Sequence, residues 1–103
     1  MKYFNYKLDK KGVASITFDT PKSNANLFSS ASISELNKQL DVLLMEKDIK
    51  LLLIQSAKEH IFIAGADINE IKTAKTEKEI NDFVKSGQDL FTKLEKLPFA
   101  TLA

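Results

Sequence analysis

The sequence predicts an α/β fold, formed by one small domain or by part of a larger one. Two segments with the apolar–polar alternation of strands come first in the 103-residue chain. Two stretches with the helical spacing of apolar residues follow, and each leads into a short apolar run. An apolar run directly after a helix is typical of a parallel strand that is reached by a helical crossover. We therefore expect the element order β-β-α-β-α-β.

The first two predicted strands form an antiparallel hairpin. Residues 3–9 alternate apolar and polar side chains, and residues 13–19 do the same, with every second residue from Ala14 to Phe18 apolar. The polar residues between the two segments end in Gly12, which can adopt the positive φ that tight turns require. A short polar turn between two alternating segments is the usual sequence pattern of a hairpin.

An irregular loop and a helix are expected next. Residues 20–30 combine a proline with asparagines and serines, a composition typical of loops. Ser32 with Glu35 three residues later fits a capping box, and apolar residues recur at helical spacing beyond it. A helix is therefore predicted over residues 31–46. The apolar run over residues 50–56 predicts a buried, parallel strand.

A second amphipathic helix is predicted near the C-terminus. Thr76 with Glu79 fits another capping box, residues 77–96 carry a long apolar stripe, and Pro98 ends the helix. Residues 99–103 then begin another apolar strand. Because this strand is begun and not continued, and nothing follows to cover the apolar helix faces, we expect the chain to be a fragment that is incomplete at its C-terminus.

The overall charge argues against two classes of partner. Fifteen basic and fourteen acidic residues leave a net charge of +1, which predicts neither nucleic-acid binding nor a membrane-surface role. No apolar run approaches the ~18 residues of a membrane span, and the N-terminus lacks the apolar core of a signal peptide. The chain has no cysteine, which fits a reducing compartment. We therefore expect a soluble, cytoplasmic protein.

The segment HIFIAGADINEI contains the clearest chemical pattern in the chain. Gly65 permits a close backbone approach that a Cβ atom would block. Asp67 is expected to cap a short helix that runs through Ile68 and Ile71. The backbone N–H of Ala66 would then face outward at the helix start and could stabilise an anionic oxygen. The alternative that the residues leave open is an Ala-Gly-Ala-Asp turn that only begins a helix.

The segment IFIAGADINEI, residues 61–71, resembles the first signature of the crotonase (enoyl-CoA hydratase/isomerase) superfamily. The loop PKSNAN, residues 21–26, and the order of elements around both segments are also similar to that family. The resemblance is closest to the N-terminal hydratase domain of multifunctional fatty-acid-oxidation α-subunits. It implies that residues 1–103 form the N-terminal part of a crotonase-type spiral of β-β-α units.

The resemblance also assigns site residues. It implies that the backbone N–H of Ala66 is one of two donors in the oxyanion hole that holds the thioester carbonyl of an acyl-CoA. The carbonyl oxygen of Ala64 would accept from the adenine amino group. The residues implied to bind the substrate are Lys22, Ser23, Ala25, Asn26, Ala64, Gly65, Asp67 and Ile68.

The activity that the resemblance implies is the hydration of trans-2-enoyl-CoA in fatty-acid β-oxidation. Coenzyme A is part of the substrate, hydration needs no cofactor, and NAD would serve only a downstream dehydrogenase domain. The implied assembly is a homo-oligomer or a complex with a thiolase subunit. Two other classes remain open: a non-catalytic CoA-binding or self-associating module, and another crotonase reaction, such as isomerisation, decarboxylation or thioester hydrolysis.

Acid–base and metal-ligating side chains are sparse. The second oxyanion donor and the two catalytic acids of the family lie after the strand that residues 99–103 begin, so the fragment alone is expected to be inactive. Glu59, Glu70 and Asp67 match no catalytic position of the family, and Glu70 is interpreted as a helix-surface residue. His60, the only histidine, is predicted to lie in a surface loop. One histidine, no cysteine and no carboxylates at ligand spacing predict no metal site.

Overall fold

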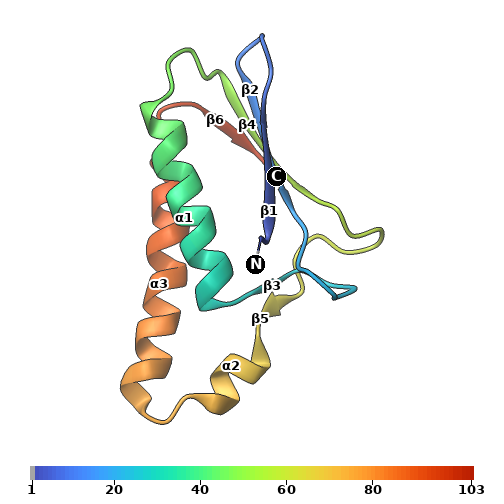
Figure 1. The fold of residues 1–103 in the computed structure, drawn as a ribbon. Coiled ribbons are helices and arrows are strands. Elements are labelled where there is room, and N and C mark those ends of the chain that lie inside the picture. Colours follow the sequence, from blue (N-terminus) through green and yellow to red (C-terminus); the bar gives the residue numbers. More distant parts are fainter. Residues whose placement is uncertain (1) are drawn as a thin grey trace.

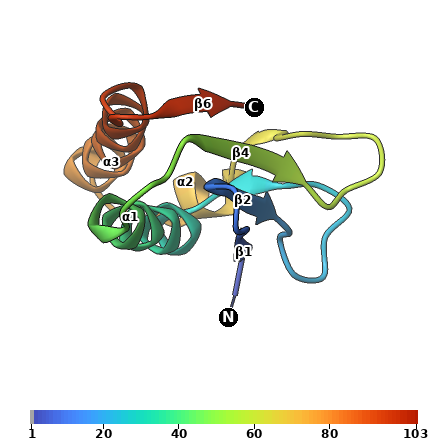
Figure 2. The same ribbon diagram turned by 90° about the horizontal axis from the view of Figure 1, so that it is seen from above.

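The computed structural model describes residues 2–103 and has two helices packed along one face of a four-stranded sheet (Figures 1 and 2). A smaller two-stranded sheet and a short helix lie beside the end of this layer (Figure 1). The elements in chain order are β1 (Phe4–Leu8), β2 (Val13–Phe18), β3 (Leu27–Phe28), α1 (Ser30–Met45), β4 (Leu51–Ser56), β5 (Gly65–Ala66), α2 (Ile68–Thr73), α3 (Glu77–Glu95) and β6 (Ala100–Leu102).

The larger sheet has the strand order β1-β2-β4-β6. β1 and β2 pair antiparallel with Phe4 opposite Phe18, which confirms the predicted hairpin. β2 and β4 pair parallel with Val13 opposite Leu51, and β6 pairs parallel with β4, which confirms the helical crossovers. In the hairpin turn, the Asp9 carboxylate accepts hydrogen bonds from two backbone N–H groups, at Val13 and Lys11, and these lower the pKa of Asp9 below its usual value.

The core lies between this sheet and the two long helices. The alternation predicted for β2 is confirmed, since Ala14, Ile16 and Phe18 are buried on one face. The ring of Phe18 stacks on that of Phe4 at a centroid distance of 4.3 Å. The buried apolar residues are Phe4, Ala14, Ile16, Phe18, Ile33, Leu36, Leu40, Leu43, Leu52 and Leu90.

Burial of β4 is one-sided, which differs from the prediction. Only Leu52 is fully buried in this strand, whereas Leu51 and Leu53 are half-buried and Gln55 is exposed. The reason is that the two long helices cover the same face of the sheet, so alternate residues of β4 have no helix packed against them (Figure 2).

The start of α1 differs from the capping box predicted at Ser32 and Glu35. The cap is Ser29, whose hydroxyl accepts from the N–H of Ser32, while the Ser32 hydroxyl accepts from the N–H of Ser29 at 2.8 Å. The Glu35 carboxylate instead accepts from the N–H of Phe4 at 2.8 Å and of Tyr3 at 2.9 Å. Glu35 therefore joins α1 to the start of β1, a tertiary contact that local spacing cannot predict.

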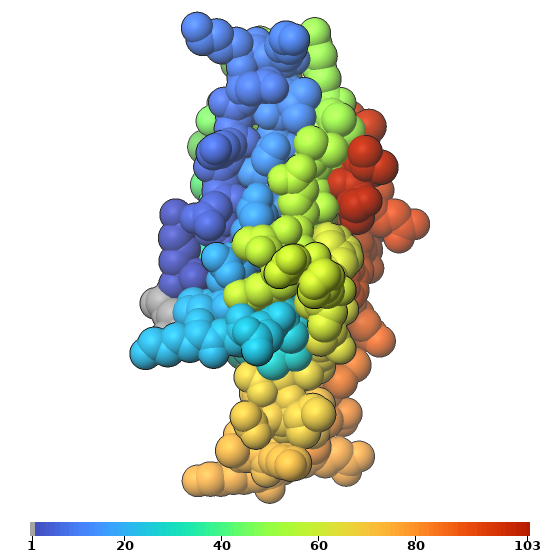
Figure 3. All heavy atoms as spheres, turned by 90° about the vertical axis from the view of Figure 1, so that its right-hand side faces the viewer, coloured from blue at the N-terminus to red at the C-terminus, as the bar shows by residue number. Residues whose placement is uncertain are grey.

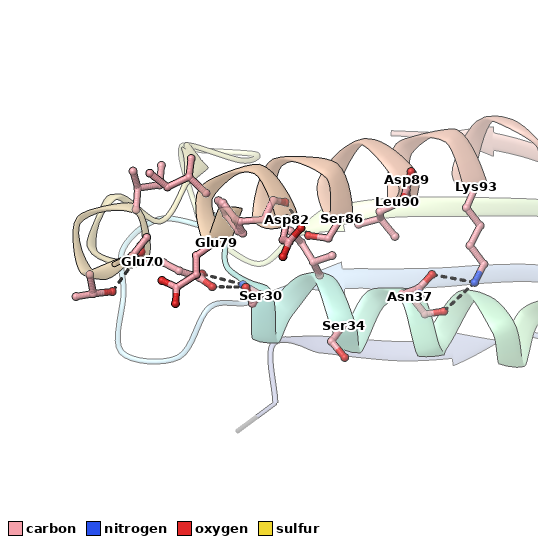
Figure 4. A pocket seen from close by; sticks show the side chains of 16 residues that line it. Ser30, Ser34, Asn37, Glu70, Glu79, Asp82, Ser86, Asp89, Leu90 and Lys93 are labelled. Atoms are coloured by element: carbon pink, nitrogen blue, oxygen red, sulfur yellow. Dashed lines mark hydrogen bonds between the residues drawn. The ribbon is translucent and has the colours of Figure 1, made fainter. Parts of the chain in front are cut away.

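The capping box predicted for α3 is confirmed only in part. Thr76 is the N-cap residue, and its hydroxyl accepts from the N–H of Glu79 at 3.2 Å. The Glu79 carboxylate accepts from the N–H of Lys75 at 2.6 Å rather than from the cap residue itself. Near the other end of α3, the Lys93 ammonium donates to Asn37 Oδ1 at 2.8 Å and thereby links the two long helices (Figure 4). Among residues 2–103, no helix has the length and apolar character that crossing a membrane requires.

The hairpin turn depends on Gly12, and we expect Gly12→Ala to destabilise the protein by about 1–3 kcal/mol. Gly12 has a φ of +89°, and a Cβ atom there would lie 2.4 Å from the carbonyl oxygen of Asp48. Urea unfolding followed by circular dichroism measures the change. Gly87→Ala in α3 is the matched control, because its Cβ atom would meet only Ile33 at 3.9 Å and the change is expected to be neutral or stabilising. Equal unfolding midpoints for the two variants would contradict this prediction.

Candidate functional site

The candidate site is built around the small sheet of β3 and β5, which pair in parallel (Figure 1). Leu27 lies opposite Gly65, and Phe28 lies opposite Ala66. An irregular loop was predicted for residues 20–30, so β3 is a correction to that prediction. A two-residue strand has too little sequence to show a period, and here it forms because a partner segment approaches it. The pairing brings the two segments singled out in the sequence, residues 21–26 and residues 61–71, side by side.

Gly65 sets the direction of the chain in this segment. No protein atom lies within 4 Å of the position that its Cβ would occupy. Its φ is +128°, a backbone conformation that residues with a Cβ rarely adopt. The glycine therefore serves to turn the chain between Ala64 and Ala66.

The segment around Ala66 is anchored at both of its ends. The Ala64 N–H donates to the carbonyl of Asn26 at 2.8 Å, and the Asp67 N–H donates to the carbonyl of Phe28 at 2.8 Å. Both bonds reach β3 although Ala64 and Asp67 are three residues apart, an interval at which the N–H groups of a regular strand point to opposite sides, so the chain departs from a regular strand between them. Ala66 lies between these two anchors and is an exposed residue.

Asp67 caps α2 as predicted. It is the N-cap residue, and its carboxylate accepts from the N–H of Asn69 at 2.9 Å. Ile68 follows as the first helical residue and is 64% exposed. The helix predicted through Ile68 and Ile71 is therefore present, although it contains only six residues.

Asn26 is a buried polar hub. Its side chain is fully buried, with Oδ1 accepting from the N–H of Thr20 at 3.1 Å. Its Nδ2 donates to Ser56 Oγ and to the carbonyl of Phe62, both at 2.8 Å. Asn26 thus joins the loop before β3 to the segment after β4, and Figure 3 shows these two segments side by side on one face. Its amide is occupied, so it holds the site together from inside.

The remaining predicted residues of this loop lie at the surface. Lys22 is exposed and has a positive φ of 55°. Ser23 and Ala25 are half-buried, and Ser23 Oγ accepts from the N–H of Ala25 at 3.1 Å. Sequence reasoning missed Lys58, whose ammonium donates to Asp19 Oδ1 at 2.6 Å and so anchors the start of the loop. No local signal marks Lys58, because its partner is distant in the sequence.

An open groove of about 570 Å³ adjoins the Ala66 peptide. One wall is formed by residues 62–66 with Phe28, and the other by α3 through Phe83, Gly87 and Phe91. The walls are mostly apolar and are suited to a hydrocarbon chain or to further apolar elements. The exposed residue Ala66 and this apolar surface therefore lie next to each other.

A second groove of about 790 Å³, lined by a mixture of polar and apolar residues, lies between α1, α2 and α3 (Figure 4). Glu70 lies in it, half-buried, with its carboxylate accepting from the N–H of Ser30 at 2.8 Å. Glu70 thus lies on the surface of α2, as predicted, and makes a tertiary contact that the prediction did not include. Its position three residues after the Asp67 cap is that of a local capping-box acid, which hid its tertiary contact.

His60 lies in a loop at the surface of the protein. The His60 side chain is 87% exposed, which confirms a surface loop, and its Nε2 atom lies 3.7 Å from the carboxylate of Glu59. Within residues 2–103, no three side chains of the types that ligate metals lie close enough together to hold an ion.

Comparison with known proteins places this geometry in a class. Residues 9–103 match the enoyl-CoA hydratase/isomerase family. The structure superposes on a crystal structure of an enoyl-CoA hydratase from Mycobacterium smegmatis with a TM-score of 0.88 and 18% identity, over 98% of this chain and 38% of that one. For an enoyl-CoA hydratase from Shewanella pealeana the TM-score is 0.83 and the identity 29%, over 97% of this chain and 37% of that one. The fold is therefore of the crotonase type, as predicted.

The sequence comparison names the family more closely. The chain is 38% identical over 101 residues to a fatty acid oxidation complex subunit alpha of Aliivibrio fischeri, covering 97% of this chain and 15% of that protein. The chain belongs to the enoyl-CoA hydratase/isomerase family. The predicted similarity to fatty-acid-oxidation α-subunits is confirmed. The chain spans only a small part of the length of these relatives.

Proposed function

We propose that the full-length protein is an enoyl-CoA hydratase of fatty-acid β-oxidation, which adds water to trans-2-enoyl-CoA. The observation that carries this proposal is the exposed residue Ala66, held between the Ala64 and Asp67 hydrogen bonds, and its backbone N–H is proposed to face the substrate. A preorganised donor of this kind stabilises the negative charge that develops on the thioester oxygen. It acts in the transition state, where the enolate forms, rather than in simple binding.

The substrate is proposed to lie across both surface segments. Ala64, Gly65, Ala66, Asp67 and Ile68 would contact it from one side. On the other side, Lys22, Ser23 and Ala25 would lie along the pantetheine and phosphates, while the fully buried Asn26 would hold the loop in place. The lysine supplies a positive charge for a phosphate, and the adjacent apolar groove is suited to an acyl chain.

The acid and base of the reaction are proposed to come from outside these 103 residues. Hydration needs one carboxylate to activate water and another to donate the α-proton. The two acids that follow Ala66 in the sequence are already engaged, since Asp67 caps α2 and Glu70 bonds Ser30. The residues present would therefore bind and polarise the thioester, and they would not supply the proton transfers.

The proposed cellular setting follows from the same relatives. We propose a cytoplasmic protein that assembles as a homo-oligomer or with a thiolase subunit. Hydration itself needs no cofactor besides the coenzyme A carried by the substrate, and NAD would serve only a dehydrogenase domain in the same protein. Size-exclusion chromatography with light scattering, with and without a thiolase subunit, tests the assembly.

A hydration assay tests the proposed activity. The full-length protein is expected to consume crotonyl-CoA, which is followed by the loss of the ultraviolet absorbance of the conjugated thioester. The pure 103-residue chain is expected to be inactive, because it lacks free acids beside Ala66. Hydration by the 103-residue chain would overturn the prediction of inactivity, and an inactive full-length protein would overturn the proposed function.

A second candidate is a self-associating or CoA-binding module without chemistry. The exposed apolar side chains along the groove favour it, because Phe62 is 44%, Val84 49% and Phe91 53% exposed. Acyl-CoA binding by a full-length protein that does not hydrate it would support this candidate. A change of product to an isomerised, decarboxylated or hydrolysed thioester would instead support another reaction of the crotonase superfamily.

A further inference from the structure

Glu70 connects the short helix after the candidate oxyanion donor to the start of α1. Its Oε2 atom accepts from the N–H of Ser30 at 2.8 Å, and its Oε1 atom accepts from the Ser30 hydroxyl (Figure 4). Ser30 is the first residue of α1, directly after the cap residue Ser29. A carboxylate in this position satisfies a backbone donor that no residue of its own helix can bond, and it also faces the positive end of the helix dipole.

We propose that Glu70 is a positioning residue for the Ala66 N–H. Only a short stretch of chain separates the two groups. Glu70 N donates to the carbonyl of Asp67 at 3.2 Å, so Glu70 lies in the first turn of α2, which follows Asp67. Asp67 in turn bonds Phe28, and Phe28 is two residues before Ser30. Residues 28–30 and 67–70 are therefore joined twice, once by backbone and once by Glu70.

The segment that contains Ala66 and α2 belongs to very short elements. β3 and β5 each contain two residues, and α2 contains six and has no buried residue. A helix this short has little stability of its own. The direction of the Ala66 N–H therefore depends on a few hydrogen bonds, of which the Glu70 contact is the charged one that joins residues 67–70 to residues 28–30. A small displacement of a catalytic donor is enough to slow a reaction strongly.

The catalytic consequence rests on the proposed function, whereas the mechanical consequence does not. In the full-length protein, Glu70→Ala is expected to lower kcat for enoyl-CoA hydration about tenfold and to leave KM within about twofold. Glu70→Gln should have a smaller effect, because it keeps an acceptor and loses the charge. Hydrogen exchange of the peptide that contains residues 64–73 should become faster in both variants.

Ser30→Pro tests the same contact from the other side. Proline is favoured at the first position of a helix, and Ser29 has an extended backbone with φ −123° and ψ 170°, which suits a residue before proline. This variant removes both donors to Glu70 while keeping α1. It should slow hydration as Glu70→Ala does, and the double variant should be no slower than either single variant.

Glu77→Gln is the matched control, because Glu77 is an exposed acid in the first turn of α3 that takes part in none of the side-chain hydrogen bonds described for residues 2–103. It removes the same charge and should leave exchange and kcat unchanged. Glu70 variants with wild-type exchange over residues 64–73 would overturn the positioning role. If the wild-type protein does not hydrate enoyl-CoA, the proposed function fails, and the exchange measurement alone decides the role of Glu70.

Discussion

Ala66→Pro is expected to lower kcat for enoyl-CoA hydration by about 10²–10³-fold, which corresponds to about 3–4 kcal/mol of transition-state stabilisation. Proline has no N–H, so the change deletes the proposed oxyanion donor. The loss should be confined to that donor. The flanking hydrogen bonds to β3 belong to the N–H groups of Ala64 and Asp67, and neither of them uses the Ala66 N–H. The preceding residue is Gly65, which has no Cβ to clash with the proline ring.

The measurement is steady-state kinetics on the full-length protein, together with the thermal unfolding midpoint. Because the donor acts in the transition state, kcat should fall much more than KM rises. Ala66→Ser is the matched control, since it changes the side chain and keeps the N–H, and it should remain close to wild type. A proline variant that is folded and fully active would remove Ala66 from the catalytic machinery.

Asn26→Ala is expected to destabilise the protein by about 2–4 kcal/mol. The change deletes three hydrogen bonds in a site that is fully buried. It leaves the N–H of Thr20 and the carbonyl of Phe62 without their partner. A polar group that loses its hydrogen-bond partner inside a protein lowers the stability of the fold, because water does not replace that partner. Urea unfolding followed by circular dichroism measures the loss.

Asn24→Ala supplies the control for this prediction. Asn24 is exposed in the same loop, and its side chain takes part in no hydrogen bond that the structure describes within residues 2–103. Its substitution should change the free energy of unfolding by no more than about 0.5 kcal/mol. If both asparagine variants unfold at the same urea concentration, Asn26 is not the hub that its contacts indicate.

Local patterns predicted the large elements well. The hairpin, the crossover helices and the parallel strands follow from alternation in residues 13–19 and from the helical stripes around α1 and α3. These patterns are reliable because a half-buried strand and an amphipathic helix each repeat their burial over several residues. The cap of α2 at Asp67 was predicted for a similar reason, since the preference for an acid at this position is local.

The contacts that organise the site could not be predicted in this way. Glu35 and Glu70 each stand where a local capping acid is expected, yet each bonds a distant segment, the start of β1 or the start of α1. The strand β3 is two residues long and exists through its pairing with β5. Asn26 appeared as a polar loop residue, and only its partners in other segments explain why it is buried.

The sequence by itself determined the α/β class, the order of elements and the segment that carries the candidate donor, because these depend on periods and turn residues within a few positions of each other. The tertiary structure decided how the segment around Ala66 is anchored to β3 and which conformation Gly65 adopts. It also decided which acids are free and which are bonded. Such features depend on hydrogen bonds between residues about thirty to forty positions apart, and a pattern along the chain carries no record of which distant donor meets which acceptor.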